Sequence, residues 1–336
     1  MRRLTLILSD LYLPDERHPA GEFPQTHPLP GLSWLLSRAD RTEHIGDWRR
    51  WLLIEVGGPR VEVPLAGICA YELVSDAERE TAWLATPVAL EARLDHVRLI
   101  DRGLLHLDPD ERAAVCAEFN RTFAPQYVLH DCNARAFILS GLRSPAAVPD
   151  PARVLGNEIG PALPGADAPE LRRLWAEIEM WLHGSAFNDA RERARKRRIS
   201  SLWLWGGNAE PLGSHGQDPR DLELYGGDPL IGALSRMRQS PRREVAKSLT
   251  HLAGSRGHVI AEFAVLTGEP QESLAALDAD WFAAARHALE SGALTRLDIV
   301  VNDRCFRITP RARWKFWRRQ RGWLANLARR QEVPKA

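Results

Sequence analysis

The feature that most constrains the fold is a run of large apolar side chains ending in two glycines, ISSLWLWGGN at Ile199–Asn208. Successive side chains of a strand point to opposite faces, so the leucines of this run would lie on one face and the tryptophans on the other. Apolar side chains on both faces are typical of a central strand covered by helices. The run therefore predicts a buried strand, and Gly206–Gly207 predicts a turn with a positive φ angle.

The composition sets the fold class and the domain plan. The 336 residues are 44% hydrophobic and 26% charged, which suffices for one large or two medium domains. We expect a mixed α/β protein, mostly one central sheet flanked by helices, with a C-terminal hairpin and helix. Residues 1–225 would form the core that carries SLWLWGG, and residues 226–336 a smaller α+β portion, either separate or integral to the same domain.

Charge and cysteine usage indicate a cytoplasmic protein. The net charge of +1 gives the whole chain no strong attraction to nucleic acid or membrane. The four cysteines are scattered without C-x-x-C spacing, which favours buried, reduced thiols. The apolar run Leu4–Leu8 is broken by Asp10 and fits a first strand better than a signal peptide. No segment approaches the roughly 18 apolar residues of a transmembrane helix.

Periodicity predicts the main elements. Asp108, Pro109 and Glu111 have the spacing of a capping box at the start of a helix that ends before Pro125. An apolar stripe predicts a second helix over Leu171–Leu182, capped by Asp167. Further expectations are strands at Trp83–Ala85, Val97–Ile100, Tyr127–His130 and Ala136–Leu139, helices at Leu32–Leu36 and at Trp281–Glu290 with Asp280 as its cap, a strand or helix at His258–Leu266, and a hairpin over residues 297–308.

The common catalytic motifs are missing from the sequence. No H-E-x-x-H, P-loop, dinucleotide fingerprint or G-x-S-x-G occurs. Adjacent His130 and Asp131 on a strand would point to opposite faces and make a poor pair of metal ligands. Ser214–His215 lies in a Gly/Pro-rich loop, and neighbouring residues rarely form a nucleophile–base pair. We therefore predict no catalytic residue, no metal site and no cofactor.

Two basic segments leave nucleic-acid binding as an alternative. Arg191–Arg198 reads RERARKRR, which is either a phosphate-binding run or a solvated helix face. The segment Arg311–Arg330 mixes arginines with tryptophans, which can stack on bases or lie at a membrane surface. The spacing of Leu324 and Leu327 after Trp317 and Trp323 favours a C-terminal helix that docks its tryptophans on the body of the protein.

A polar cluster is expected beside the motif strand. Arg191 is a fork donor suited to phosphate or carboxylate, and His183 and Asn188 precede it near helix ends. The competing interpretation is a buried hydrogen-bond network that fixes helix to strand. The candidate anion-binding residues are His183, Asn188, Arg191, Ser201, Trp205, Gly206 and Gly207.

The segment Glu177–Asn208 resembles the RpfE-type bacterial regulatory proteins, whose pattern includes E-I-Q-M-x-L-H and N-S-L-W-L-W-G-G-G. Residues 83–101 and the stretch WKFWRR near the C-terminus resemble further segments of that family. The resemblance implies a regulatory protein with a small anionic ligand or a protein partner. The matching positions are Glu177, Met180, Leu182, His183, Asn188, Arg191 and Ser201 through Gly207.

The same pattern is similar to archaeal-type cofactor-independent phosphoglycerate mutases, two-metal enzymes of the alkaline-phosphatase-like group. The resemblance implies a degenerate fold of that kind. This chain has Asp10 without a following glycine, and its one D-H dipeptide, Asp95–His96, lies outside a metal-site context. The leading hypothesis is thus a non-catalytic or vestigial protein. The alternative is a metal-dependent phosphohydrolase or mutase with atypical ligands such as Asp10, His130 or Asp131.

Overall fold

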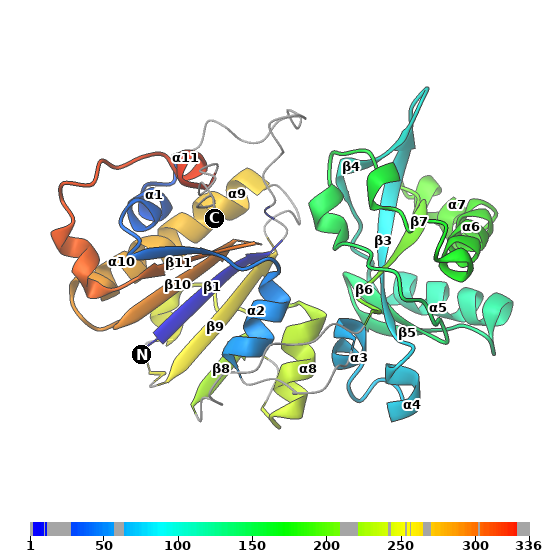
Figure 1. Cartoon of the computed structure of the whole chain (residues 1–336), viewed down its shortest axis with the longest axis horizontal. Coiled ribbons are helices and arrows are strands. Elements are labelled where there is room, and N and C mark those ends of the chain that lie inside the picture. Colours follow the sequence, from blue (N-terminus) through cyan, green and yellow to red (C-terminus); the bar gives the residue numbers. More distant parts are fainter. Residues whose placement is uncertain are drawn as a thin grey trace.

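The chain builds two β-sheets with helices packed around them (Figure 1). The computed structural model describes residues 3–9, 11, 28–56, 64–208, 221–240, 243–252, 254–255, 257–264, 270–301 and 303–327. The predicted mixed α/β class is confirmed, although the helices flank two sheets and not one central sheet. No helix in these ranges combines the length and the apolar character needed to cross a bilayer.

The larger sheet has six strands in the order β2-β11-β10-β1-β9-β8. The four strands from β10 to β8 pair in parallel, so their carboxyl ends lie along one edge, and β11 and β2 add antiparallel pairs. Ligand sites of open α/β sheets lie at such an edge. The strands are β1 (Arg3–Ser9), β2 (Arg41–His44), β8 (Leu222–Tyr225), β9 (His258–Ala264), β10 (Arg296–Val301) and β11 (Arg304–Ile308).

The first strand lies in the middle of this sheet, between two strands from the last third of the chain. Leu4 of β1 is in register with Val259 of β9 and with Leu297 of β10. The predicted boundary at residue 225 therefore falls inside the sheet, directly after β8. The strands β3 to β7 of the other sheet all lie between residues 83 and 205, as a unit between β2 and β8.

Helices cover both faces of the larger sheet (Figure 1), which explains the unbroken apolar run of β1. Leu4, Leu6 and Leu8 pack in one core cluster, and Ile7 packs in the other. One face carries α1 (Pro30–Ser37), α9 (Pro270–Leu277), α10 (Ala283–Glu290) and α11 (Trp323–Leu327), and the other carries α2 (Trp48–Glu55) and α8 (Pro229–Met237).

Two of the expected helix caps are wrong. Asp280 lies within a π-helical turn, Asp278–Phe282, that runs directly into α10, so no helix begins there. The neighbouring carboxylate of Asp278 instead accepts from the backbone N–H groups of Gly31 (3.0 Å) and Leu32 (2.7 Å), at the start of α1. Asp167 does not cap its helix either, because the N-cap is Ala168 without a side-chain hydrogen bond.

The smaller sheet has five strands, and every pair in it is antiparallel. Its strands are β3 (Trp83–Ala92), β4 (Val97–Leu104), β5 (Val128–Asn133), β6 (Ala136–Ser140) and β7 (Ser201–Trp205). The motif strand β7 is fully buried, as predicted, but it pairs with β3 alone among the described strands. Trp175 of α6 packs edge-on against Trp203 of β7, with ring centroids 5.0 Å apart.

The helices of the smaller sheet agree well with the sequence predictions. Asp108 and Glu111 form the expected capping box at the start of α5 (Pro109–Phe123). The stripe over Leu171–Leu182 forms α6 (Pro169–His183), and its apolar face is buried. The remaining helical segments are α3 (Leu65–Cys69), α4 (Asp76–Arg79), α7 (Ala186–Arg193) and the short turns Pro151–Val154, Gly160–Ala162, Leu249–Leu252 and Pro310–Trp314.

The C-terminal segment docks only in part. Trp323 and Leu327 of α11 are buried against the larger sheet's helices, as predicted. Trp314, Phe316 and Trp317 are 62%, 79% and 68% exposed, so the prediction that the tryptophans dock is wrong for Trp314 and Trp317.

Candidate functional site

The predicted anion-binding residues do not surround one cavity. His183 ends α6 and is exposed. Ser201 and Trp205 are the first and last residues of β7, about 13 Å apart at the usual rise of a strand. Gly206–Gly207 follows Trp205, at the opposite end of β7 from Asn188.

Asn188 and Arg191 belong to the hydrogen-bond network that was the competing interpretation. Asn188 is 1% exposed, and its amide donates to the carbonyls of Leu182 (2.8 Å) and Ile199 (2.9 Å). The buried guanidinium of Arg191 donates to Glu111 (2.7 Å) and to the carbonyl of Arg197 (2.7 Å). These side chains fix α7 to the segment that enters β7, through both amide N–H groups of Asn188 and two N–H groups of Arg191.

Gly206 and Gly207 are each required by the fold, for different reasons. Gly206 has a φ angle of +70°, the positive value that the sequence predicts. A Cβ at Gly207 would lie 2.1 Å from the indole of Trp83, so only glycine fits there.

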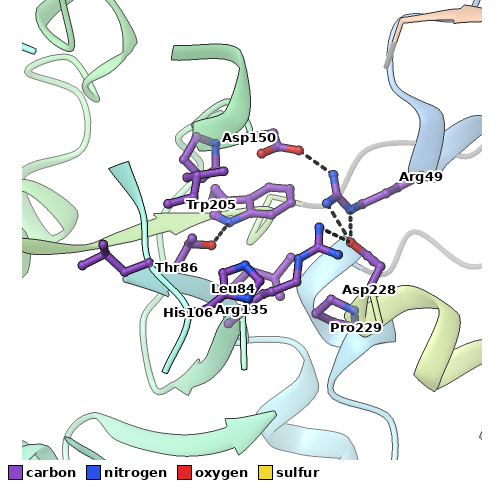
Figure 2. Close-up of a pocket in the computed structure, with 13 residues that line it drawn as sticks. Arg49, Leu84, Thr86, His106, Arg135, Asp150, Trp205, Asp228 and Pro229 are labelled. Carbon is purple, nitrogen blue, oxygen red and sulfur yellow. Dashed lines mark hydrogen bonds and ion pairs between the residues drawn. The ribbon is translucent and has the colours of Figure 1, made fainter. Parts of the chain in front are cut away.

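Trp205 does face a site, which lies between the two sheets (Figure 2). Its indole nitrogen donates to Thr86 (3.0 Å), and the guanidinium of Arg49 lies 4.8 Å from the centre of its ring. These groups line a cavity of about 30 Å³, enough room for one or two water molecules. It is lined by Arg49, Leu84, Thr86, Leu104, Leu105, His106, Arg135, Ala136, Asp150, Pro151, Trp205, Asp228 and Pro229.

Arg49 of α2 joins the two sheets at this cavity (Figure 2). Its buried guanidinium binds Asp150 (2.5 Å), on the side of the smaller sheet, and Asp228 (2.8 Å), the N-cap of α8. Burial alone would raise the pKa of Asp228, but the charges of Arg49 and Arg135 lower it below its usual range. Both partners therefore stay charged, and the ion pair ties the units together.

Glu262 of β9 is the second centre of this network. Its Oε1 accepts from the hydroxyl of Ser9 and from Arg135 (2.9 Å), and its Oε2 accepts from the backbone N–H groups of Gly227 (3.0 Å) and Asp228 (3.1 Å). Arg135 comes from the turn between β5 and β6, so the smaller sheet reaches the carboxyl edge of the larger one. We call Arg49, Arg135, Asp150, Asp228 and Glu262 the inter-sheet ion network.

A larger pocket of about 400 Å³ opens beside this network, where β8 and β9 end. Its volume lies in the range of small-molecule sites. The half-buried ring of Phe263 lines this pocket and packs on the buried ring of Trp281, with ring centroids 5.0 Å apart, and Lys247 is exposed at its side. We call it the strand-end pocket; it is lined by Arg135, Gly227, Val245, Ala246, Lys247, Glu262, Phe263, Ala264, Ala276, Leu277, Asp280 and Trp281.

The candidate metal ligands are engaged elsewhere. His130 hydrogen-bonds to Ser140 (3.0 Å), while Asp131 accepts from Arg112 (2.8 Å). Across the described ranges, no group of three or more His, Cys, Asp or Glu residues has the arrangement of a metal site. Asp10 and Ser214–His215 lie outside those ranges.

Sequence reasoning missed the inter-sheet ion network because its members are far apart in the chain. One signal was present. The segment LYGGDP at Leu224–Pro229 repeats the pattern of a strand followed by two glycines, and it then adds a helix cap, Asp228, and a proline. Gly226 is required there, since a Cβ would lie 2.8 Å from the carboxylate of Glu262.

Comparison with known proteins gives only distant structural similarity. No family model and no curated protein matches the chain. The cofactor-independent phosphoglycerate mutase of Thermoplasma acidophilum DSM 1728 aligns with 92% of this chain and 90% of its own, at 14% identity and a TM-score of 0.34. The protein PH0037 of Pyrococcus horikoshii aligns with 92% of this chain and 87% of its own, at 12% identity and a TM-score of 0.45. At these values neither similarity assigns a family or an activity.

Proposed function

We propose that this chain is a non-catalytic, vestigial relative of the phosphoglycerate mutases that binds a small organic anion in the strand-end pocket. The observation that carries the proposal is that the carboxylates beside the pocket are paired with guanidinium groups. Glu262 is bound by Arg135, and Asp228 by Arg49. A carboxylate that is neutralised by a guanidinium is a poor ligand for a divalent cation, which two-metal phosphoryl transfer requires.

The pocket offers complementary groups for the two ends of an organic anion. Glu262 already accepts hydrogen bonds from four donors, so its carboxylate does not need Lys247 as a partner. The exposed ammonium group of Lys247 can therefore bind the carboxylate or phosphate of a ligand. The half-buried ring of Phe263 offers an apolar surface for the body of the ligand. This assignment moves the predicted anion site from the end of α7 to the edge of the larger sheet.

The regulatory part of the proposal is supported by the likeness of Glu177–Asn208 to the RpfE-type proteins. In such a role the ligand changes what the protein binds, and no turnover is needed. A protein partner and a cytoplasmic location belong to the same proposal. The occupied hydrogen-bonding groups of Asn188 and Arg191 support a structural task for the motif.

Calorimetric titration of the whole chain tests the proposal. The probes are inorganic phosphate, 3-phosphoglycerate and phenylpyruvate, which separate a bare anion from anions with an organic body. We expect the organic anions to bind more tightly than phosphate. Lys247→Gln should weaken them about tenfold, because it removes a charged hydrogen bond. Lys196→Gln is the matched control, since Lys196 is exposed on the smaller sheet's side and pairs with Asp108.

Two results would contradict the proposal. Equal affinity of the wild type and the Lys247→Gln variant for every probe would remove the strand-end pocket as the anion site. Phosphoglycerate mutase turnover with added manganese would show that the chain is an enzyme, and it would favour the metal-dependent alternative.

A further inference from the structure

The segment Pro310–Arg321, between β11 and α11, concentrates apolar and basic side chains on the surface. It reads PRARWKFWRRQR and carries six basic residues without one acidic residue. In Figure 1 it runs along the outer side of the larger sheet, at the end of the molecule away from the smaller sheet. We call it the aromatic–basic loop.

The exposure of its aromatic side chains is unusual for this chain. Trp314, Phe316 and Trp317 are three of the eight large apolar side chains that are exposed among the described residues. The other five, of which Leu94 and Met180 are the most exposed, are spread over α2, the smaller sheet and its surroundings. Clustered exposed apolar area marks a surface that another body covers.

The loop is fixed to the body of the protein by its polar groups. Lys315 binds Asp40 (2.5 Å), and Arg318 donates to the carbonyl of Ala39 (2.6 Å). Arg313 donates to the carbonyl of Glu290 (3.1 Å), and the buried Trp323 anchors the segment that follows. The aromatic rings are therefore held outward in a defined place, which lowers the entropic cost of binding.

The arrangement of the rings favours an anionic lipid surface over a single-stranded nucleic acid as the binding partner. Phe316 and Trp317 meet edge to face, with centroids 5.4 Å apart at 81°, and the guanidinium of Arg313 covers a face of Trp314 at 4.9 Å. Because Phe316 and Trp317 are not parallel to each other, they do not form one continuous platform on which successive bases of a single strand would stack. Tryptophan and phenylalanine are typical of segments that lie in the interface of a lipid bilayer, where basic side chains are attracted to anionic headgroups.

We infer that the aromatic–basic loop is a contact site for a membrane surface that carries anionic lipid. Phe316 and Trp317 enter the interfacial region, and the arginines around them lie at the level of the headgroups. The chain then binds the membrane from one side without spanning it. This inference does not depend on the ligand of the strand-end pocket, which lies elsewhere on the molecule.

Co-sedimentation of the whole chain with vesicles tests the inference. We expect binding to vesicles of equal parts phosphatidylcholine and phosphatidylglycerol, and little to phosphatidylcholine alone. Raising the salt concentration from about 0.05 to about 0.5 M should weaken binding at least about tenfold, because the headgroup attraction is screened. The double variants Phe316→Ser/Trp317→Ser and Arg311→Gln/Arg319→Gln should each weaken it about tenfold or more.

Two control variants match these changes in kind. Leu94→Ser/Met180→Ser removes two strongly exposed apolar side chains, and Arg121→Gln/Arg172→Gln removes two exposed charges from the helices α5 and α6. Both should bind as the wild type does. Far-ultraviolet circular dichroism confirms that each variant is folded.

Three results would overturn the inference. One is no binding to the anionic vesicles, and another is an equal loss in the control variants. The third is retention of single-stranded oligothymidylate that Phe316→Ser/Trp317→Ser abolishes while vesicle binding stays unchanged, which would make the loop a nucleic-acid site.

Discussion

Arg135 Nη1 lies 2.9 Å from Glu262 Oε1, and this contact links the β5–β6 turn of one sheet to a central strand of the other. The two residues are separated by 127 positions in the sequence. Glu262 is 1% exposed, so its charge has little solvent to stabilise it. The pair therefore stabilises the fold, and it also positions one wall of the strand-end pocket, which both residues line.

Arg135→Gln should destabilise the chain by about 3–5 kcal/mol, since a buried carboxylate loses its cation. Glu262→Gln should cost less, because the amide oxygen keeps acceptor capacity for the backbone N–H groups. The double variant should be markedly more stable than the sum of the single losses predicts. Urea unfolding of the four proteins measures this coupling, and simple additivity would show that the pair does not act as a unit.

Arg49→Gln should also lower the free energy of unfolding by about 3–5 kcal/mol, because two buried carboxylates, Asp150 and Asp228, lose one shared guanidinium. Arg193→Gln, on the exposed face of α7, should change it by no more than about 0.5 kcal/mol. Denaturant unfolding compares the two. A similar small effect of both variants would mean that the sheets are held together without the inter-sheet ion network.

Acid should weaken the fold through His258 of β9. Burial, with the charges of Arg3 and Arg296, lowers the pKa of this histidine from 6.5 to about 3, and its ring hydrogen-bonds to Thr5 (2.9 Å). The unfolded chain takes up the proton below about pH 6.5, while the native chain resists it. The contribution is thus present above pH 6.5, and between about pH 6.5 and about pH 3 it is lost, by at most about 5 kcal/mol.

The variant His258→Asn isolates that contribution. Between about pH 6 and about pH 4, the unfolding free energy of the variant should fall less steeply with pH than that of the wild type. The two slopes should differ by up to the amount that the uptake of one proton contributes. His183→Asn, an exposed change, should leave the slope as it is. Parallel stability curves for wild type and His258→Asn would refute the prediction.

Gly207→Ala should destabilise by about 1–3 kcal/mol, because the new methyl group overlaps the buried ring of Trp83. That ring is held by a hydrogen bond to the carbonyl of Leu142 (3.1 Å) and has little room to move. Gly184→Ala serves as the control, since nothing lies within 4 Å of a Cβ there. Thermal unfolding should give a lower Tm than the wild type for Gly207→Ala and an equal or higher Tm for Gly184→Ala. An equal Tm for both variants would refute the prediction.

Local rules predicted local structure well. The capping box of Asp108 and Glu111, the strand at Leu4–Leu8 and the helical stripe before His183 all follow from neighbours within a few residues. Pairing between distant strands does not follow from such rules. Nothing in Ser201–Trp205 says that its partner is β3 in an antiparallel sheet, because a strand buried on both faces has the same pattern in either sheet.

The candidate site was harder to predict, for a related reason. The polar residues before β7 do cluster, but a cluster binds a ligand only where it has free hydrogen-bond donors. Asn188 has none in its amide group, because both N–H groups donate to backbone carbonyls. Glu262 lies inside an apolar strand and shows no motif. Its importance comes from Ser9, Arg135 and Gly227, which only the tertiary fold brings to it.

The central place of β1 has a consequence for synthesis on the ribosome. Its hydrogen-bonding partners, β9 and β10, emerge only after residues 258 and 296. The smaller sheet, complete by residue 205, can form long before then. The apolar β1 therefore has no strand partner until β9 and β10 have been synthesised, so we expect nascent chains that end before β10 to depend on chaperones that shield β1.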